Sequence, residues 1–210
     1  YNFVVAVDDA LMEMTDVIRG DDHLSNTPKQ IVVYNALGFK VPKFYHVPMI
    51  NNPSGKKLSK RDGAMDVMDY KNQGYLPEAL LNFLVRLGWS NGDQEIFSME
   101  DMLELFDPSN INKSASAYNA EKLLWLNSEY IKAVSNDRLI EELKFFDLDL
   151  SHHPKRTELL DLSKQRAQTI VELKASVNSI LEVPTEYEEA GVKKFVKEDT
   201  KDFLEKYLEL

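Results

Sequence analysis

Four cationic side chains stand within six consecutive positions of one short segment, which has a glycine at each end. This segment, termed the basic loop, consists of Gly55, Lys56, Lys57, Leu58, Ser59, Lys60, Arg61, Asp62 and Gly63. Unpaired ammonium groups are too costly to bury, so the segment is not expected in a core strand or helix. Lysines act as point charges on phosphate oxygens, and backbone N–H groups beside glycine can approach a phosphate closely. The sequence therefore predicts a mobile loop that closes over a polyanion, with a solvated basic turn as the alternative.

A second candidate residue is Arg19, which follows the apolar pair Val17 and Ile18. Its planar guanidinium can bind a carboxylate through two parallel hydrogen bonds. The alternative is an ion pair with Asp16 or Asp21, its neighbours in the sequence. Taken alone, the residue types leave both interpretations open.

The elements that must position these residues alternate between strand and helix in the first 63 residues. Residues 3–7 and 17–19 have the β-branched composition of short strands. A helix is expected to begin at residues 25–28, which end in proline, and to end at Gly38. Residues 44–50 return as a strand. Strand, helix, strand and then a loop is the order in the second half of a doubly wound nucleotide fold, where ligands bind at the carboxyl ends of the strands.

From about residue 64 onward the apolar pattern becomes helical. The first helices are expected at residues 77–87, 98–106 and 120–126, and the chain after residue 137 is predominantly helical. The helix at 77–87 is apolar nearly all round, which is typical of a buried helix. The next one starts at Ser98 with Asp101 three positions later, close to a capping box. We expect Trp89 and Trp125 to anchor the core and the pair at 152–153 to be solvated.

Composition narrows the class of protein. The 210 residues are 43% apolar and 29% charged, which is typical of a soluble protein of one or two domains. No apolar run approaches the roughly 20 residues that span a bilayer, and we expect no signal peptide. The absence of cysteine excludes disulfides and thiolate metal sites. His23 follows two aspartates, but three such residues in a row are not a ligand geometry, so no metal site is predicted.

The net charge is −10, whereas proteins that bind nucleic acid usually carry a basic patch. The excess acid lies late in the chain, around residues 186–189 and in the last residues. The charge therefore weakens a claim of general nucleic-acid affinity but leaves room for a local phosphate site. The sequence opens at Tyr1 rather than at methionine, so we expect a fragment of a longer protein.

Residues 57–61, Lys-Leu-Ser-Lys-Arg, resemble the second signature of class I aminoacyl-tRNA synthetases, Lys-Met-Ser-Lys-Ser in consensus. The surrounding runs resemble the bacterial glutamyl-tRNA synthetases of that class in the same order, at residues 16–28, 74–82, 87–90, 114–117 and 122–127. The resemblance is dense to about residue 130 and thins afterwards. It implies an α/β rear half of a Rossmann catalytic domain at 1–63. A helical tRNA stem-contact domain at 64–137 and the start of an α-helical anticodon-binding domain at 138–210 would follow.

The resemblance also implies a reaction. Glutamate is activated by ATP with Mg²⁺, pyrophosphate leaves, and the glutamyl group passes to the 3′ end of tRNA(Glu). Such catalysis consists mostly of positioning and of neutralising phosphate charge. Lys60 matches the lysine that contacts the ATP phosphates, with Lys57 as its companion. Ser59 would keep the loop compact, its alternative being an ordinary turn serine. His23 matches a position near the nucleotide.

Three residues match positions that contact the amino acid. Arg19 matches the arginine that reads the side-chain carboxylate in glutamyl enzymes, and glutaminyl enzymes lack it. Tyr1 matches a tyrosine that hydrogen-bonds the same side chain, the alternative being a strand-edge aromatic. Val5 falls where some members carry a polar contact, and valine can supply only packing there.

Contacts to the tRNA backbone are predicted at Lys113, Ser114 and Ser116, because phosphate contacts commonly come from such side chains. The first class I signature, which resembles His-x-Gly-His, is absent from the sequence. We therefore expect the chain alone not to adenylate glutamate and its longer parent to do so. The expected protein is a cytoplasmic monomer that contacts no membrane and has no zinc site in this segment.

Three alternatives remain. A glutaminyl-tRNA synthetase is disfavoured by Arg19. A paralogue that loads glutamate onto queuosine in tRNA lacks a long helical anticodon domain, so the helical tail from about residue 138 counts against it. A non-catalytic tRNA-binding module is disfavoured by the intact basic loop, although the missing first signature keeps it open for this chain.

Overall fold

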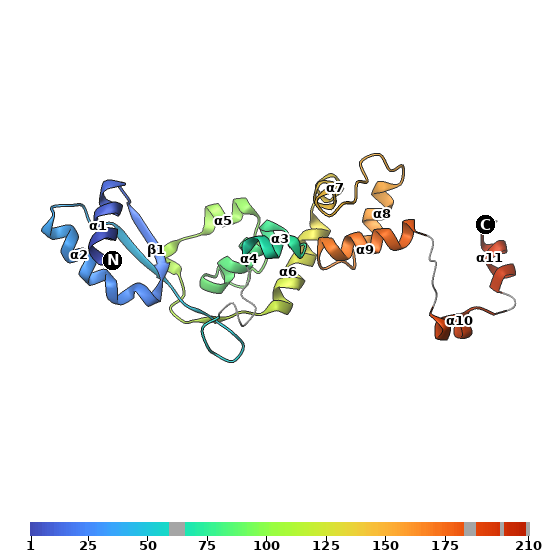
Figure 1. The fold of residues 1–210 in the computed structure, drawn as a ribbon, viewed down its shortest axis with the longest axis horizontal. Coiled ribbons are helices and arrows are strands. Elements are labelled where there is room, and N and C mark those ends of the chain that lie inside the picture. Colours follow the sequence, from blue (N-terminus) through green and yellow to red (C-terminus); the bar gives the residue numbers. More distant parts are fainter. Residues whose placement is uncertain (59–65, 183–187, 198–199, 209–210) are drawn as a thin grey trace.

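The computed structural model describes residues 1–58, 66–182, 188–197 and 200–208. The described chain is elongated, with an α/β unit at its N-terminal end and helices along the rest of its length (Figure 1). Within the described residues, none of the helices combines the length and apolar character needed to cross a membrane. Ser59 and Lys60 of the basic loop lie outside the described residues.

The N-terminal α/β unit contains the predicted strand–helix–strand. Its elements are α1 (Asn2–Leu11), β1 (Asp16–Gly20), the 3-10 helix η1 (Asp21–Asn26), α2 (Thr27–Ala36) and β2 (Lys43–Val47). The two strands are parallel, and Arg19 of β1 lies opposite His46 of β2. Helix α2 has proline in its first turn and is followed by Gly38 at φ +70°, a left-handed conformation that glycine adopts without strain. The order β1–α2–β2 confirms the prediction for this part of the chain.

Residues 3–7 were predicted as a strand, and this prediction is wrong, because they lie inside α1. Packing against α2 decides their structure. Ala6 is fully buried, and Asn2, one helical turn before it, bonds to the side chains of Asn26 and Gln30. Positions four apart share a helix face, so these two small residues let α1 lie close to α2 and outweigh the β-branched composition. Tyr1 is therefore the residue that precedes a helix and not a strand-edge aromatic.

A second pair of short parallel strands, β3 (Ile50–Asn51) and β4 (Ser116–Ala117), links the end of the α/β unit to the helices. The helical elements are α3 (Val67–Asn72), α4 (Pro77–Gly88), α5 (Met99–Leu105), η3 (Pro108–Asn110), α6 (Ala120–Ala133), α7 (Asn136–Phe145), α8 (Arg156–Ser163), α9 (Ile170–Leu181), α10 (Glu189–Phe195) and α11 (Thr200–Leu208). The three predicted helices are confirmed as α4, α5 and α6. Ser98 and Asp101 form the reciprocal hydrogen bonds of a capping box at the start of α5.

The two tryptophans differ in burial. Trp89 is 2% exposed and packs with Phe97 and Met102, as predicted. Trp125 is 41% exposed, so its prediction as a core anchor is wrong. Helix α6 turns Leu123 and Leu126 into the core, and Trp125 lies off that face.

A buried polar cluster joins α4, α6 and the segment before α9. The side-chain oxygen of Asn127 accepts the N–H of Leu76 at 2.8 Å, and its amide nitrogen donates to the carbonyl of Gln168 at 2.6 Å and to that of Gly74 at 3.3 Å. The Gly74 carbonyl also accepts the N–H of Ile170 at 2.9 Å. Around this cluster, one apolar core extends from Leu76 to Val177 and includes residues on both sides of position 137.

Candidate active site

Arg19, Thr27 and His46 meet at the carboxyl ends of β1 and β2. The Arg19 Nη2 donates to the Thr27 hydroxyl at 2.8 Å, and the same oxygen lies 3.0 Å from the His46 Nε2. The guanidinium carbon lies 5.2 Å from the centre of the Phe44 ring, which supports the planar group from one side. Parallel strands place their carboxyl ends at one edge, so the fold brings these side chains together.

The alternative interpretation of Arg19, an ion pair with a neighbouring aspartate, is not supported by the structure. Neither Asp16 nor Asp21 forms an ion pair with Arg19, nor does any other carboxylate in the described part of the chain. The Arg19 Nε is buried and has no hydrogen-bond partner among the described residues. Because a guanidinium has five N–H donors and Thr27 receives one of them, the group keeps the donors that two-point binding of a carboxylate needs.

Tyr1 and His23 lie together beside this cluster. The Tyr1 hydroxyl is 3.2 Å from the His23 Nδ1, and the Asn26 amide nitrogen is 3.4 Å from the same atom. The two rings are 5.8 Å apart between centroids. Val5 lies partly buried on α1, one turn after Tyr1. The residues predicted to contact glutamate, together with His23, thus come from the start of α1, from β1 and from η1, at one end of the α/β unit.

Sequence reasoning missed Thr27 and His46 as members of this site. Partial burial, together with the nearby charge of Arg19, lowers the pKa of His46 below its ordinary value, while Asp21 opposes the change and His23 adds to it. His46 is therefore neutral at pH 7, and one ring nitrogen can accept a hydrogen bond. The signal that could have revealed it is the strand register, which sets His46 opposite Arg19.

The described part of the basic loop is a tight turn. The side-chain oxygen of Asn52 accepts the N–H groups of Ser54 at 3.1 Å and Lys56 at 3.0 Å, and Gly55 has φ +82°. Lys57 then pairs with Asn51 in an isolated antiparallel bridge. This arrangement directs the chain back along β3 at Lys57, the first of the residues predicted to contact phosphate.

Lys57 connects the loop to η1. Its Nζ lies 3.5 Å from a carboxylate oxygen of Asp22, and its side chain is 66% exposed. Gly20 makes room for that aspartate, because a Cβ at Gly20 would lie 2.6 Å from the Asp22 Oδ1. The ion pair places the start of the basic loop beside the residue that precedes His23.

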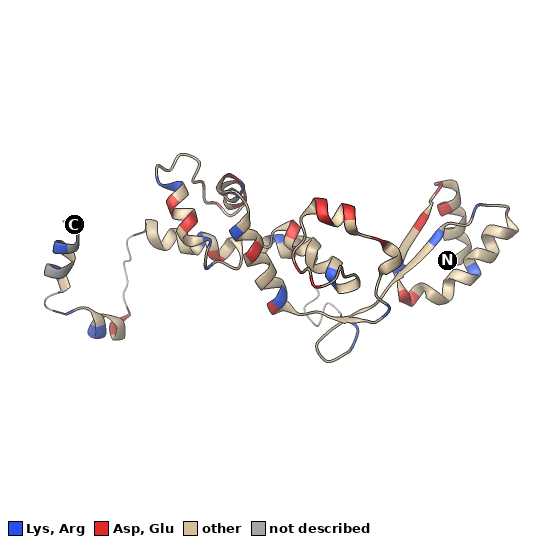
Figure 2. Cartoon of the chain, turned by 180° about the vertical axis from the view of Figure 1, so that it is seen from behind, with Lys and Arg blue, Asp and Glu red and all other residues tan. Residues whose placement is uncertain are grey.

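The residues predicted to contact tRNA differ in their surroundings. Lys113 is exposed and lines a pocket of about 450 Å³ together with Asp21, Tyr45 and His46. Ser114 is exposed, whereas the hydroxyl of Ser116 donates to the Leu87 carbonyl within the fold. Figure 2 marks the acidic residues of α5, which are Glu100, Asp101 and Glu104, and this helix contains no Lys or Arg.

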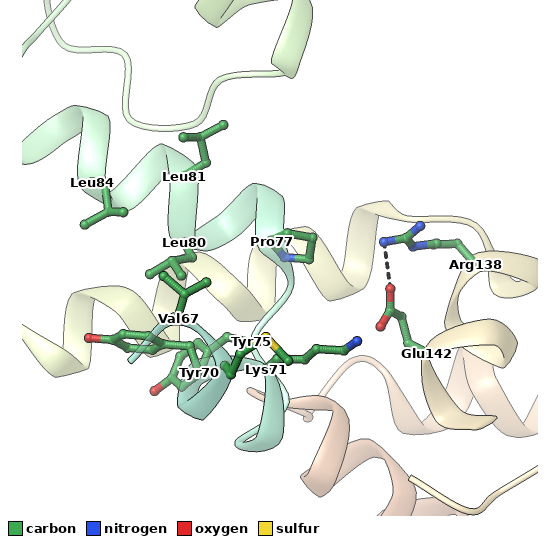
Figure 3. A pocket seen from close by; sticks show the side chains of 11 residues that line it. Val67, Tyr70, Lys71, Tyr75, Pro77, Leu80, Leu81, Leu84, Arg138 and Glu142 are labelled. Atoms are coloured by element: carbon green, nitrogen blue, oxygen red, sulfur yellow. Dashed lines mark ion pairs between the residues drawn. The ribbon is translucent and has the colours of Figure 1, made fainter. Parts of the chain in front are cut away.

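A separate pocket of about 490 Å³ lies between α3, α4 and α7 (Figure 3). Leu81 and Leu84 of α4 line it and are 37% and 45% exposed, so the expectation of a helix buried on all sides is wrong for these two positions. Helix α4 buries Leu80, Phe83 and Leu87 instead, which form the face that packs on α6. An ion pair between Arg138 and Glu142, at 2.6 Å, closes one side of the pocket.

Comparisons with known proteins agree with this arrangement. A family model described as tRNA synthetases class I (E and Q), catalytic domain, matches residues 1–125, and one described as an anticodon binding domain matches residues 101–210. Glutamate–tRNA ligase 1 of Aliarcobacter butzleri is 86% identical over 208 residues, which are 99% of this chain and 44% of that protein. Glutamate–tRNA ligase 1 of a Sulfurovum species is 66% identical over 99% of this chain and 45% of its own length.

A solved structure has a similar fold. The crystal structure of a glutamate tRNA ligase from Elizabethkingia meningosepticum, in complex with its amino acid, matches with a TM-score of 0.81 and 31% sequence identity. The match covers 98% of this chain and 45% of that one. The chain therefore spans under half the length of the relatives that it matches.

Proposed function

This chain belongs to the class I tRNA synthetases for glutamate and glutamine, and on that premise we propose that it is part of a glutamate–tRNA ligase. Its share would be the rear half of the catalytic domain, residues 1–63, followed by a stem-contact domain at 64–137 and the start of the anticodon-binding domain at 138–210. The reaction would take place in the cytoplasm. One observation carries the choice of glutamate: Arg19 lies at the carboxyl end of β1 with no carboxylate partner in the described chain and with a buried, unpaired Nε.

The proposed reaction has two steps. The α-carboxylate of glutamate attacks the α-phosphate of ATP, whose Mg²⁺ enters with it as substrate, and pyrophosphate leaves. A hydroxyl at the 3′ end of tRNA(Glu) then attacks the acyl carbon of the glutamyl-adenylate, and AMP leaves as the ester forms.

Each site residue has a proposed part in the first step. The Arg19 guanidinium holds the side-chain carboxylate of glutamate by two parallel hydrogen bonds, and the Tyr1 hydroxyl donates to the same group. Val5 packs against the substrate's methylene groups. Lys57 and Lys60 neutralise charge on the phosphates as pyrophosphate departs, Ser59 keeps the loop compact, and His23 contacts the nucleotide.

The tRNA would lie along the helical part. Lys113 and Ser114 are exposed and can reach a phosphate, which supports a role in backbone contact. Ser116 would act only indirectly, by helping to form β4, because its hydroxyl proton is donated to the Leu87 carbonyl. The match to an anticodon-binding model through residue 210 favours the ligase over a paralogue without that domain.

The experiment is tRNA-dependent ATP–pyrophosphate exchange with the full-length protein, with glutamate and with glutamine. Arg19→Gln is expected to raise the KM for glutamate by about a hundredfold, because a charged group loses its charged partner. Lys29→Gln is the matched control, since Lys29 is an exposed cation in the first turn of α2, and it should match the wild type. Exchange with glutamine but not with glutamate would refute the proposal.

A second variant tests the basic loop. Lys60→Ala in the full-length protein should lower the exchange rate by about 10²–10³-fold, the usual effect of deleting one donor to a transition-state charge. Affinity for tRNA, measured by filter binding, should stay within about twofold, because Lys60 would contact ATP while the tRNA backbone would lie along the helical part. Equal losses in exchange and in tRNA affinity would contradict the role in ATP chemistry and would favour a tRNA-binding module.

A further inference from the structure

We propose that Thr27 and His46 are positioning residues for Arg19, and that the chain of contacts His46–Thr27–Arg19 sets the direction in which the guanidinium meets a side-chain carboxylate. The inference rests on the proposed function, since it concerns how that substrate is recognised. The three side chains come from α2, β2 and β1, so their meeting depends on the fold and not on neighbouring positions in the sequence.

The proton positions follow from the donor and acceptor inventory. Arginine can only donate, so the Thr27 oxygen accepts the N–H of Arg19 at 2.8 Å. The single proton of Thr27 is then free for the His46 Nε2 at 3.0 Å, which accepts it when the ring proton is on Nδ1. The lowered pKa of His46, which faces the charged side chains of Arg19 and Asp21 and the titratable ring of His23, keeps the His46 ring neutral and able to accept. One assignment of protons therefore satisfies both contacts.

The Thr27 hydroxyl has no competing local task. The capping position of α2 belongs to Asn26, which makes no side-chain cap hydrogen bond, so helix capping does not engage Thr27, the first residue of the helix. Its hydroxyl points instead to the two residues at the strand ends. These contacts are the ones expected of a hydroxyl that orients Arg19.

Two fixed contacts define the guanidinium plane. Phe44 supports one face at 5.2 Å, and Thr27 holds one end through Nη2. A long arginine side chain otherwise loses rotamer entropy when it binds, so a group that is already oriented binds a carboxylate more tightly. Loss of the Thr27 hydroxyl should therefore weaken glutamate binding while ATP binding stays the same.

The test compares Thr27→Val, which removes the hydroxyl and keeps the shape, with Thr27→Ser, which keeps the hydroxyl. In the full-length protein, Thr27→Val should raise the KM for glutamate by about three- to tenfold, the effect of one lost orienting hydrogen bond. The KM for ATP and kcat should stay within about twofold, and Thr27→Ser should restore the glutamate KM. Thr15→Val, at an exposed threonine before β1, is the matched control.

Two variants of His46 supply an independent test. His46→Gln offers an acceptor of similar reach and should stay near the wild-type glutamate KM, whereas His46→Phe should resemble Thr27→Val. An unchanged glutamate KM in Thr27→Val would overturn the inference, as would equal rises in the KM for glutamate and ATP with a lower melting temperature. If Arg19→Gln impairs glutamate use but Thr27→Val does not, the inference alone fails. If the wild type shows no exchange with glutamate, the proposed function fails and the inference falls with it.

Discussion

Replacing Asn127 by alanine should destabilise the helical part of the chain by about 2–4 kcal/mol. Asn127 is fully buried and bonds to three backbone groups. After the substitution, these three groups differ in whether they keep a hydrogen-bond partner. The N–H of Leu76 loses the acceptor that the structure gives it, at a cost of about 1–3 kcal/mol. The carbonyl of Gly74 keeps the N–H of Ile170, and that of Gln168 belongs to an exposed residue that water can reach. The space left by the amide adds about 1 kcal/mol.

The assay is urea unfolding followed by far-ultraviolet circular dichroism, which reports the free energy of unfolding of the helices. Asn72→Ala is the matched control, because Asn72 is exposed at the end of α3 and should change stability by less than about 0.5 kcal/mol. Amide exchange gives a local readout, in which the Leu76 N–H should exchange faster in Asn127→Ala. A loss of stability no larger than that of the control would refute the assignment of Asn127 as a central support.

Three more outcomes are expected. Gly74→Ala should lower stability more than Gly38→Ala, although both glycines have positive φ. A Cβ at Gly74 would lie 2.7 Å from the Ile170 backbone nitrogen, whereas a Cβ at Gly38 would have no atom within 4 Å. Equal melting temperatures of the two variants would contradict this prediction. The hydrogen bond from Lys122, and to a lesser degree that from Arg86, lowers the pKa of Glu95 below its ordinary value of 4.5. The ionised Glu95 therefore stabilises the fold at neutral pH, and this stabilisation is lost as the pH falls below about 4.5. Glu95→Gln should reduce the difference in melting temperature between pH 7 and pH 4, and an unchanged difference would contradict the stabilising role of ionised Glu95. Burial raises the pKa of Tyr130 to about 12, so stability should fall as pH rises from 10 toward 12. Burial also raises the pKa of Tyr118, so absorbance titration should show late-titrating tyrosines, with one fewer of them in Tyr130→Phe than in the wild type.

Local signals in the sequence predicted much of the fold. Proline in the first turn of α2, Gly38 after its end and Ser98 before α5 each mark an element boundary through a backbone property of that residue type. The failures came from tertiary contacts. The β-branched composition of residues 3–7 favoured a strand, but packing through Ala6 against α2 makes a helix.

The candidate site was predicted in part for a similar reason. Arg19 could be singled out because a guanidinium has one evident chemistry. Thr27 and His46 could not, because their importance depends on which positions of two strands and a helix become neighbours. Trp125 shows the same limit in the core, since its side chain falls on the face of α6 that the packing leaves open.

The Asn127 cluster has a mechanical consequence. It crosslinks three stretches of backbone at one point inside a continuous core, and close-packed cores transmit strain instead of absorbing it. The helices that contribute to this core, α4, α6, α7, α8 and α9, should therefore move together as one unit. Since α4 contacts β4, and β4 pairs with β3 just before the basic loop, a displacement of the far helices would have a continuous path of contacts to that loop.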